Sequence, residues 1–281
     1  MKLNAEQVRY LTEDDFRVLK MLETASKRQE IVPVKTVAAM AKIRPGQTNK
    51  ILTGLSVMNL VSRHQGCTED GFKFGYGAAD YLALHTLSRK HGLVGVGRQI
   101  GVGKESDIYV VETEGGPAVL KLYRLGRTSF RTVKTNRGYL KKSTRETPSW
   151  IDLSTLAAEK EFAGMQLLHR EGFPVPRPLA QNRHSVLMEL IDGTLLNNIA
   201  EIESPETLLE KLGAILRKFE ENGLVHGDFN EFNILVDENA EPVIIDFPQM
   251  IPLTHPEARF QLERDRNCLV SFFRRRFGLS L

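Results

Sequence analysis

Apolar residues in the first third of the chain recur at helical spacing and then give way to two short runs typical of strands. Phe16, Leu19 and Leu22 follow Thr12-x-x-Asp15, which has the form of a helix-capping box. The same kind of pattern predicts further helices at residues 34–41, around 51–58 and at about 78–88, and strands at 61–64 and 72–74. Helix, turn, helix and β-hairpin in this order predict a winged helix within residues 1–91.

One side of the helix around 51–58 is polar. At about 100° per residue, four side chains point away from the apolar stripe or lie at its edge: Gln47, Asn49, Lys50 and Thr53. Such a face can contact nucleic-acid bases or phosphates. An ordinary solvated face and a protein-docking face remain equally open alternatives.

Two β-branched runs in the last third, at residues 234–236 and 243–245, flank a turn-rich segment at 237–242. This pattern predicts a β-hairpin. If the hairpin is symmetric about the 239/240 bond, Asn233 lies opposite Asp246. Asp228 stands five residues before Asn233, on the loop that leads into the first strand.

These three residue types suit phosphoryl transfer. Mg²⁺ prefers oxygen ligands and keeps several waters and substrate phosphates, so Asn233 and Asp246 suffice on the protein side. A separate carboxylate, here Asp228, must orient the attacking hydroxyl and accept its proton. The pattern therefore predicts a kinase-type centre, against the alternative of a surface hairpin that happens to carry common turn residues.

The middle of the chain adds features that a kinase needs. Gly101-Val102-Gly103 precedes a strand and lets backbone N–H groups approach phosphates, although a tight turn explains these glycines about as well. Lys121 stands inside the apolar run 118–122, where an unpaired charge is costly. On the helix near 156–169, Glu161 falls on the apolar stripe and Glu159 nearly opposite, so Glu161 is the expected partner of Lys121.

A basic segment separates these features. Residues 124–145 contain eight Lys or Arg and no acidic residue, which suits phosphates, RNA backbone or an acidic surface, with a solvated loop as the alternative. The residues singled out as contacts are Arg127, Arg131, Lys134, Lys141 and Lys142, and the possible phosphoacceptors are Thr128 and Ser129. Further on, the strand at 185–189 is expected to lead into the link between two kinase lobes.

Composition adds few constraints. A hydrophobic share of 41%, a charged share of 26% and a net charge of +3 are ordinary. Apolar runs stay well short of the roughly 18–20 residues of a membrane span, and two distant cysteines, Cys67 and Cys268, form no disulfide framework. We therefore expect a cytoplasmic chain that avoids membranes.

Taken together, the motifs resemble those of the RIO-type atypical protein kinases, in the subfamily that carries a winged helix. They are Gly-x-Gly-Lys-Glu-Ser at 101–106, Leu-Gly-Arg-Thr-Ser-Phe at 125–130, His-Gly-Asp-Phe-Asn-Glu-Phe-Asn at 226–233 and Ile-Asp-Phe-Pro-Gln at 245–249. The resemblance implies an α+β chain with a winged helix at 1–91, a kinase N-lobe at 92–190 with a basic insert at 124–150, and a truncated C-lobe at 191–281.

The resemblance also implies ATP with Mg²⁺ (or Mn²⁺), a monomer, and work on the pre-ribosomal small subunit through its rRNA and proteins. Asp228, Lys121 and Asp246 are the expected catalytic residues, Asp246 also as a phosphorylated aspartate, and Asn233 and Asp246 are the expected metal ligands. The nucleotide is expected to contact Gly101, Gly103, Lys104, Ser106, Lys121, Glu161, Met188, Glu189 and Ile191.

Departures from ordinary protein kinases narrow the activity. Gly227 stands where an arginine would hold a phosphorylated activation loop, and only 35 residues follow Asp246, so peptide-docking helices have no room. A small-molecule phosphotransferase of the antibiotic-kinase type shares His-Gly-Asp and Ile-Asp-Phe but is not expected to carry a winged helix. A nucleic-acid-binding protein with a weak kinase domain is the other alternative.

Overall fold

The computed structural model describes residues 3, 5–64, 71–127 and 149–279. Contacts divide the chain into two compact units, each treated by itself below: Met1–Ala158 with Ala180–Val186, and Glu159–Leu179 with Leu187–Leu281. The predicted boundaries after residues 91 and 190 follow sequence motifs instead, and they stay predictions. Among the described residues, no helix is both long and apolar enough to cross a membrane.

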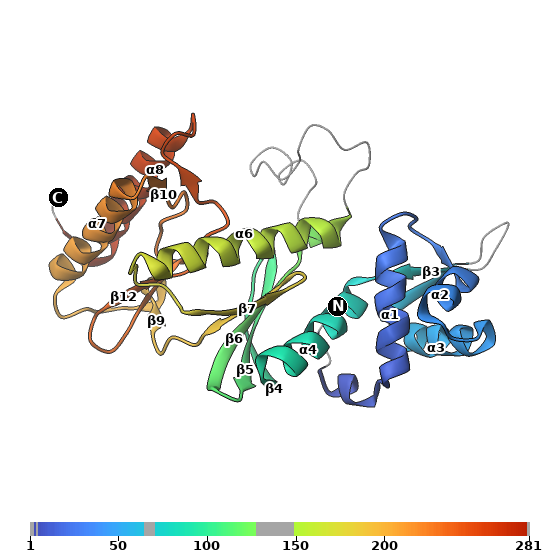
Figure 1. Cartoon of the computed structure of the whole chain (residues 1–281). Coiled ribbons are helices and arrows are strands. Elements are labelled where there is room, and N and C mark those ends of the chain that lie inside the picture. Colours follow the sequence, from blue (N-terminus) through green and yellow to red (C-terminus); the bar gives the residue numbers. More distant parts are fainter. Residues whose placement is uncertain (1–2, 4, 65–70, 128–148, 280–281) are drawn as a thin grey trace. The chain divides into compact units, whose positions relative to one another are not determined.

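The first unit begins with the predicted winged helix (Figure 1). Its elements are η1 (Ala5–Tyr10), α1 (Glu13–Ser26), β1 (Val32–Pro33), α2 (Val34–Ala41), α3 (Pro45–Val57), β2 (Val61–His64), β3 (Gly71–Phe74) and α4 (Tyr76–His91). The capping box is confirmed, because the Asp15 backbone N–H donates to Thr12 Oγ1 and the Thr12 N–H donates to Asp15 Oδ2. β1, β3 and β2 form a three-stranded antiparallel sheet in that order.

A five-stranded sheet follows, in the order β4-β5-β6-β8-β7. Its strands are β4 (Leu93–Val102), β5 (Ser106–Thr113), β6 (Gly116–Tyr123), β7 (Pro178–Asn182) and β8 (Ser185–Glu189). β4, β5 and β6 form an antiparallel meander, and their alternating side chains bury one face, with Tyr109, Val111, Leu120 and Leu122 in the core. η2 (Leu125–Arg127) comes after β6, and α6 (Trp150–Arg170) precedes β7.

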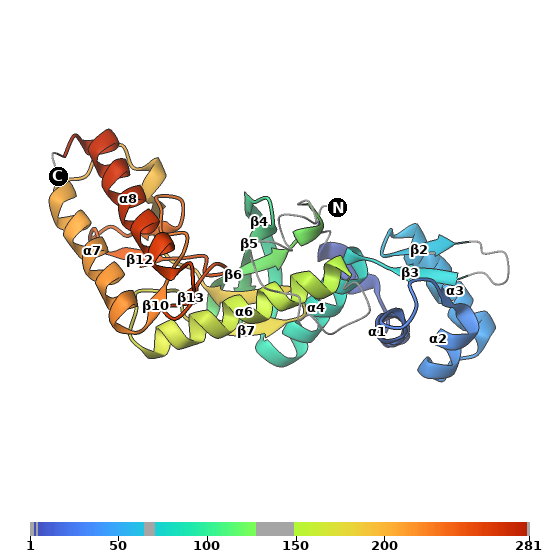
Figure 2. The same ribbon diagram turned by 90° about the horizontal axis from the view of Figure 1, so that it is seen from above.

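The second unit places short strands among two long helices. It contains β9 (Thr194–Leu195), η3 (Leu196–Asn198), α7 (Pro205–Glu221), β10 (Leu224–Val225), β11 (Ile234–Val236), β12 (Pro242–Ile244), β13 (Ile251–Pro252) and α8 (Ala258–Phe277). β12, β11 and β9 form one sheet, and β10 pairs with β13. α7 and α8 pack side by side (Figure 2), and α8 contributes buried Leu262, Leu269, Phe272 and Phe273 to the core.

The predicted hairpin exists, but its register differs by one residue from the prediction. Ile234 pairs with Ile244 and Val236 with Pro242, so the axis lies at residue 239 rather than at the 239/240 bond. The reason is a three-residue loop. The Asp237 N–H donates to Glu241 O, and Ala240 adopts φ 57°, the left-handed conformation that closes loops of this length. Asn233 therefore faces Ile245, whose N–H donates to Asn233 O at 2.9 Å, and not Asp246.

Candidate functional site

The loop between β10 and β11 carries Asp228 at the centre of a set of amide donors. Asn233 Nδ2 donates to the backbone O of Asp228 at 2.9 Å and to its Oδ2 at 3.2 Å. Asn230 Nδ2 donates to Asp228 Oδ1 at 2.9 Å, and Gln249 Nε2 donates to Oδ2 at 3.3 Å. Because these donors hold both carboxylate oxygens, the Asp228 side chain is oriented before any substrate binds.

Helix α8 anchors this loop through Asp265, which is only 1% exposed. Its Oδ2 accepts the Gly227 N–H at 2.8 Å, and its Oδ1 accepts the Phe229 N–H at 3.1 Å. These two amides flank Asp228. The sequence reasoning missed Asp265, although a carboxylate at helical spacing between Leu262 and Leu269 was a usable signal of the kind that singled out Glu161.

Gly227 has to be glycine at this point. Its φ is 79°, a region that L side chains rarely adopt, and a Cβ atom would lie 2.8 Å from Gln249 O. Gly227 stands where ordinary kinases have an arginine. Because it has no side chain, it also allows the segment after β12 to pass close to the Asp228 loop.

Asp246 follows β12 in an unusual backbone conformation. Its φ is 69°, in the left-handed region where Asp and Asn are the most tolerated residues after Gly. Because other L residues cost more there, this conformation favours Asp, Asn or Gly at position 246.

The charges of the two aspartates act on each other. Burial, and next the nearby charge of Asp246, raise the pKa of Asp228. A cation would relieve this repulsion. Asn233 uses its Nδ2 as a donor to Asp228, so its Oδ1 can serve a metal ion. Mg²⁺ takes one or two protein carboxylates or amides with substrate phosphates and water, and the residues present fit it.

His226, the first residue of the His-Gly-Asp motif, packs in the core. It is 1% exposed, and its ring contacts those of Phe219, Phe229 and Phe247. Burial lowers its pKa to about 4, with the charge of Asp246 opposing that shift. The ring is therefore neutral at pH 7 and contributes an Nδ1 acceptor, 3.2 Å from the Asp228 backbone N.

In the first unit, the predicted nucleotide loop is a tight turn between β4 and β5. The Gly103 N–H donates to Ser106 O at 2.7 Å, which closes the turn. Ser106 is 9% exposed, while Gly103 and Lys104 are exposed and Gly101 is half-buried at the end of β4. Lys121 is buried in β6, opposite Ile108 of β5, and its Nζ lies 5.1 Å from the centre of the Tyr123 ring. The glycine loop and the buried lysine therefore lie on neighbouring strands.

The other residues predicted to contact the nucleotide are Glu161, Met188, Glu189 and Ile191. Glu161 is 1% exposed and Glu159 is exposed, as the helical spacing predicted. Met188 is buried at the end of β8, and the Glu189 N–H donates to Arg177 O at 3.0 Å. Lys121 and Glu161 belong to different units, and their predicted pairing stays a prediction, as do the adenine contacts of Glu189 and Ile191.

The predicted partner-contacting residues divide into two groups. On α3, Gln47, Asn49, Lys50 and Thr53 are all exposed, and Gln47 Nε2 donates to Asp14 Oδ2 at 3.3 Å. The side chains of Arg127, Thr128, Ser129, Arg131, Lys134, Lys141 and Lys142 lie outside the described residues. For Arg124, which the sequence placed in the basic segment, the prediction of partner contact is wrong. This residue is 4% exposed and ion-paired to Asp80 and Asp107, so its charge is neutralised inside the protein.

The fold and these residues define an atypical protein kinase, and comparisons with known proteins give the family. The RIO domain family matches residues 107–281, and the Rio2 N-terminal family matches residues 8–90. The chain belongs to the RIO kinase family, in the Rio2 group.

Similar proteins cover the whole chain. A serine/threonine-protein kinase rio2 of Schizosaccharomyces pombe is 46% identical over 278 residues, which are 99% of this chain and 80% of that protein. The rio2 kinase of Dictyostelium discoideum is 45% identical, and this chain spans 53% of its length. The crystal structure of the Rio2 kinase-ADP/Mg²⁺-phosphoaspartate complex from Chaetomium thermophilum is similar, with a TM-score of 0.88 and 43% identity over 100% of this chain and 85% of that one.

Proposed function

We propose that the chain transfers the γ-phosphoryl group of ATP, with Mg²⁺ or Mn²⁺, to its own Asp246 and then to water. The observation that carries this proposal is the Asp228 loop, in which oriented carboxylate and amide groups lie next to a second carboxylate. The similarity to a Rio2 kinase crystallised with ADP, Mg²⁺ and a phosphoaspartate supports it.

The residues divide the work. When bound, the metal ion neutralises phosphate charge and aligns the transferred group. Asn233 and Asp246 are the ligands we propose for it. An Asp246 oxygen forms a bond to the γ-phosphorus as the bond to ADP breaks, and Asp228 then takes a proton from the water that hydrolyses the acyl phosphate. Gly103, Ser106 and Lys121 hold the phosphates of the nucleotide.

Labelling tests the covalent step. Wild-type chain incubated with Mg²⁺ and γ-labelled ATP should retain label that hydroxylamine removes, because acyl phosphates react with hydroxylamine and serine or threonine phosphates do not. The Asp246→Asn variant should retain none. Hydroxylamine-resistant label, equal in both chains, would instead place the phosphate on a hydroxyl side chain and overturn the Asp246 assignment.

We further propose that this activity serves maturation of the small ribosomal subunit in the cytoplasm. The similarity to Rio2 kinases over 99% of this chain, including the N-terminal domain, supports this role over that of a small-molecule phosphotransferase. Co-sedimentation with small-subunit precursors, with and without ATP, tests it: the chain should bind without ATP and leave the particle when ATP is hydrolysed. Equal binding to precursors and to mature subunits would contradict the role.

A further inference from the structure

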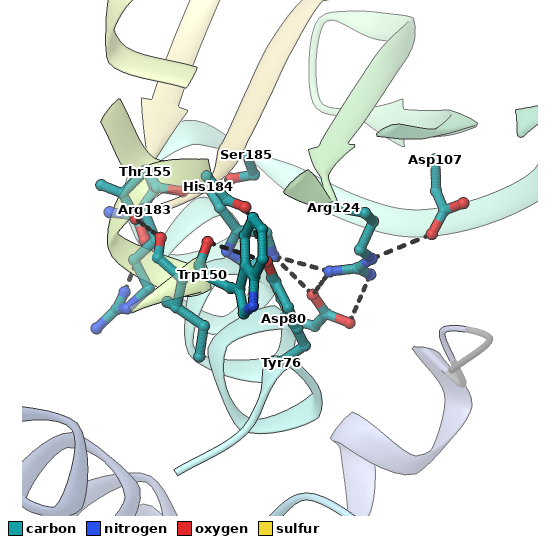
Figure 3. A network of polar contacts seen from close by, with 12 residues as sticks. Tyr76, Asp80, Asp107, Arg124, Trp150, Thr155, Arg183, His184 and Ser185 are labelled. Carbon is teal, nitrogen blue, oxygen red and sulfur yellow. Dashed lines mark hydrogen bonds and ion pairs between the residues drawn. The ribbon is translucent and has the colours of Figure 1, made fainter. Parts of the chain in front are cut away.

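A buried cluster of charged side chains lies in the first unit and contains none of the residues to which the chemistry above is assigned (Figure 3). Asp80 of α4, Asp107 of β5, Arg124 and His184 are each 4% exposed or less. Charged groups are rarely buried this fully unless they are paired, because removal from water is costly. The burial of four charged or titratable side chains together therefore points to a structural or functional role for the cluster.

Arg124 holds the centre of this cluster. Its Nη1 and Nη2 donate to the two carboxylate oxygens of Asp80 at 2.7 and 2.8 Å, and its Nε donates to Asp107 Oδ2 at 3.1 Å. His184 Nε2 lies 2.7 Å from Asp80 Oδ1. One planar guanidinium thus joins the last helix of the winged helix to a strand of the kinase sheet, in the forked geometry that lysine cannot reproduce.

Arg124 connects the cluster to the predicted nucleotide loop. The Arg124 backbone N–H donates to Glu105 O at 2.5 Å, while its side chain binds Asp107. Arg124 therefore contacts the residue before Ser106 and the residue after it. Ser106 is also the residue whose carbonyl closes the turn with the Gly103 N–H. The two contacts restrain the turn on both sides of Ser106.

We infer that Asp80 and Arg124 are positioning residues for phosphate binding: α4, through Asp80, holds Arg124 so that Arg124 holds the Gly103–Ser106 turn in its phosphate-binding shape. This inference rests on the proposed function. It makes a helix of the winged-helix domain part of the nucleotide site, although Asp80 itself does not touch the nucleotide. Tyr76, one turn earlier on α4, packs against the same guanidinium, whose Cζ lies 5.4 Å from the centre of its ring.

The chain also offers a matched control. Arg183, in the turn between β7 and β8, makes a bidentate ion pair with Glu23 of α1 at 2.6 and 2.8 Å. This pair also joins the winged helix to the sheet strands of the first unit, but within the described part of the chain neither side chain hydrogen-bonds to the β4–β5 turn. Glu23→Gln therefore removes a carboxylate from an arginine pair, as Asp80→Asn does, without loosening the phosphate loop.

Nucleotide affinity in the full chain tests the inference. ATP with Mg²⁺, and separately adenosine, would be titrated against a fluorescent ATP analogue for wild type, Asp80→Asn, Arg124→Lys and Glu23→Gln. We expect Asp80→Asn and Arg124→Lys to weaken ATP binding about tenfold, within the usual range for coupling between sites. Adenosine affinity should change less than twofold, because only phosphates meet the turn. Glu23→Gln should match wild type for both ligands.

Three results would overturn the inference. Unchanged ATP affinity in both test variants would show that the cluster does not position the turn. An equal loss for ATP and adenosine would show a general structural role, as would a loss in Glu23→Gln as large as in Asp80→Asn. If wild type itself fails to bind ATP with Mg²⁺, the proposed function is wrong. The other three results concern only the inference, because they assume that wild type binds ATP.

Discussion

At the scale of single residues, burial distinguishes side chains of the same type. Glu159 and Glu161 are two residues apart on α6, yet the first is exposed and the second is 1% exposed. A fully buried carboxylate has to be paired, whereas an exposed one on a helix contributes little to stability. Of the two glutamates, only Glu161 therefore fits the sequence-based prediction of a partner for Lys121.

We expect Glu161→Gln to lower ATP turnover at least tenfold, because a neutral amide would not form the ion pair predicted with Lys121, while Glu159→Gln changes it less than twofold. Turnover measured at saturating ATP, together with thermal unfolding of both variants, checks this prediction. Equal sensitivity at the two positions would show that Glu161 is only a core residue or that neither glutamate serves the nucleotide.

His226 predicts a pH dependence of stability. Its pKa is about 4 in the folded chain, below the ordinary value of about 6.5. As pH falls below 6.5, the unfolded chain binds a proton that the folded chain does not, so stability is lost progressively down to about pH 4. Between pH 7 and pH 5 this amounts to about 2 kcal/mol.

Denaturant unfolding of wild type and His226→Phe at both pH values measures this contribution. The phenyl ring keeps the aromatic packing but loses the Nδ1 acceptor, so the variant should be less stable at pH 7. Its loss of stability between pH 7 and pH 5 should be smaller than that of wild type by about 2 kcal/mol. The same loss in both chains would mean that other groups cause the acid sensitivity.

At the scale of elements, α8 acts as the support of the catalytic loop. Asp265→Ala would leave the buried amides of Gly227 and Phe229 without their acceptors, at a cost of about 1–3 kcal/mol each, reduced because a buried charge is also removed. We expect turnover to fall in the order wild type, Asp265→Asn, Asp265→Ala, since Asn retains one acceptor oxygen.

Exposed Asn267 on the same helix provides the control, and Asn267→Ala should leave turnover within twofold of wild type. Amide hydrogen exchange at Gly227 and Phe229 would report the loop directly. Unchanged protection of these two amides in Asp265→Ala would contradict the role given to α8.

At the scale of the whole molecule, the prediction concerns the basic segment. Arg131, Lys134, Lys141 and Lys142 lie outside the described residues, and their charge pattern remains the basis for expecting contact with an anionic surface. If the segment binds rRNA, each phosphate it neutralises contributes about 0.7–0.9 to the slope of log affinity against log salt.

Replacing these four residues with alanine should flatten that slope and loosen precursor particles while leaving ATP affinity near wild type. Asp228→Ala should behave oppositely, binding particles normally and failing to leave them with ATP. Affinities of both variants for small-subunit precursors across a salt series provide the measurement. If the alanine variant binds precursors with the affinity of wild type at every salt concentration, the segment does not contact the particle and is only a solvated insert.

The sequence by itself determined the elements and the residue types of the site, because both depend on local patterns. Apolar spacing predicted the winged helix and the burial of Glu161, the cost of an unpaired charge in an apolar strand marked Lys121, and the Asp-x-x-x-x-Asn motif identified the Asp228 loop. The capping box lies within the four residues from Thr12 to Asp15, so it too was predictable.

Only the tertiary structure decided the features that depend on distant segments meeting or on one backbone angle. The hairpin register moved by one residue because Ala240 takes a left-handed conformation that no apolar pattern encodes. Asp265 meets the amides at 227 and 229 across more than thirty intervening residues. The sequence placed Arg124 in a basic segment, but in the fold its side chain is buried. It forms ion pairs with Asp80 and Asp107, because a buried charge without a partner is costly.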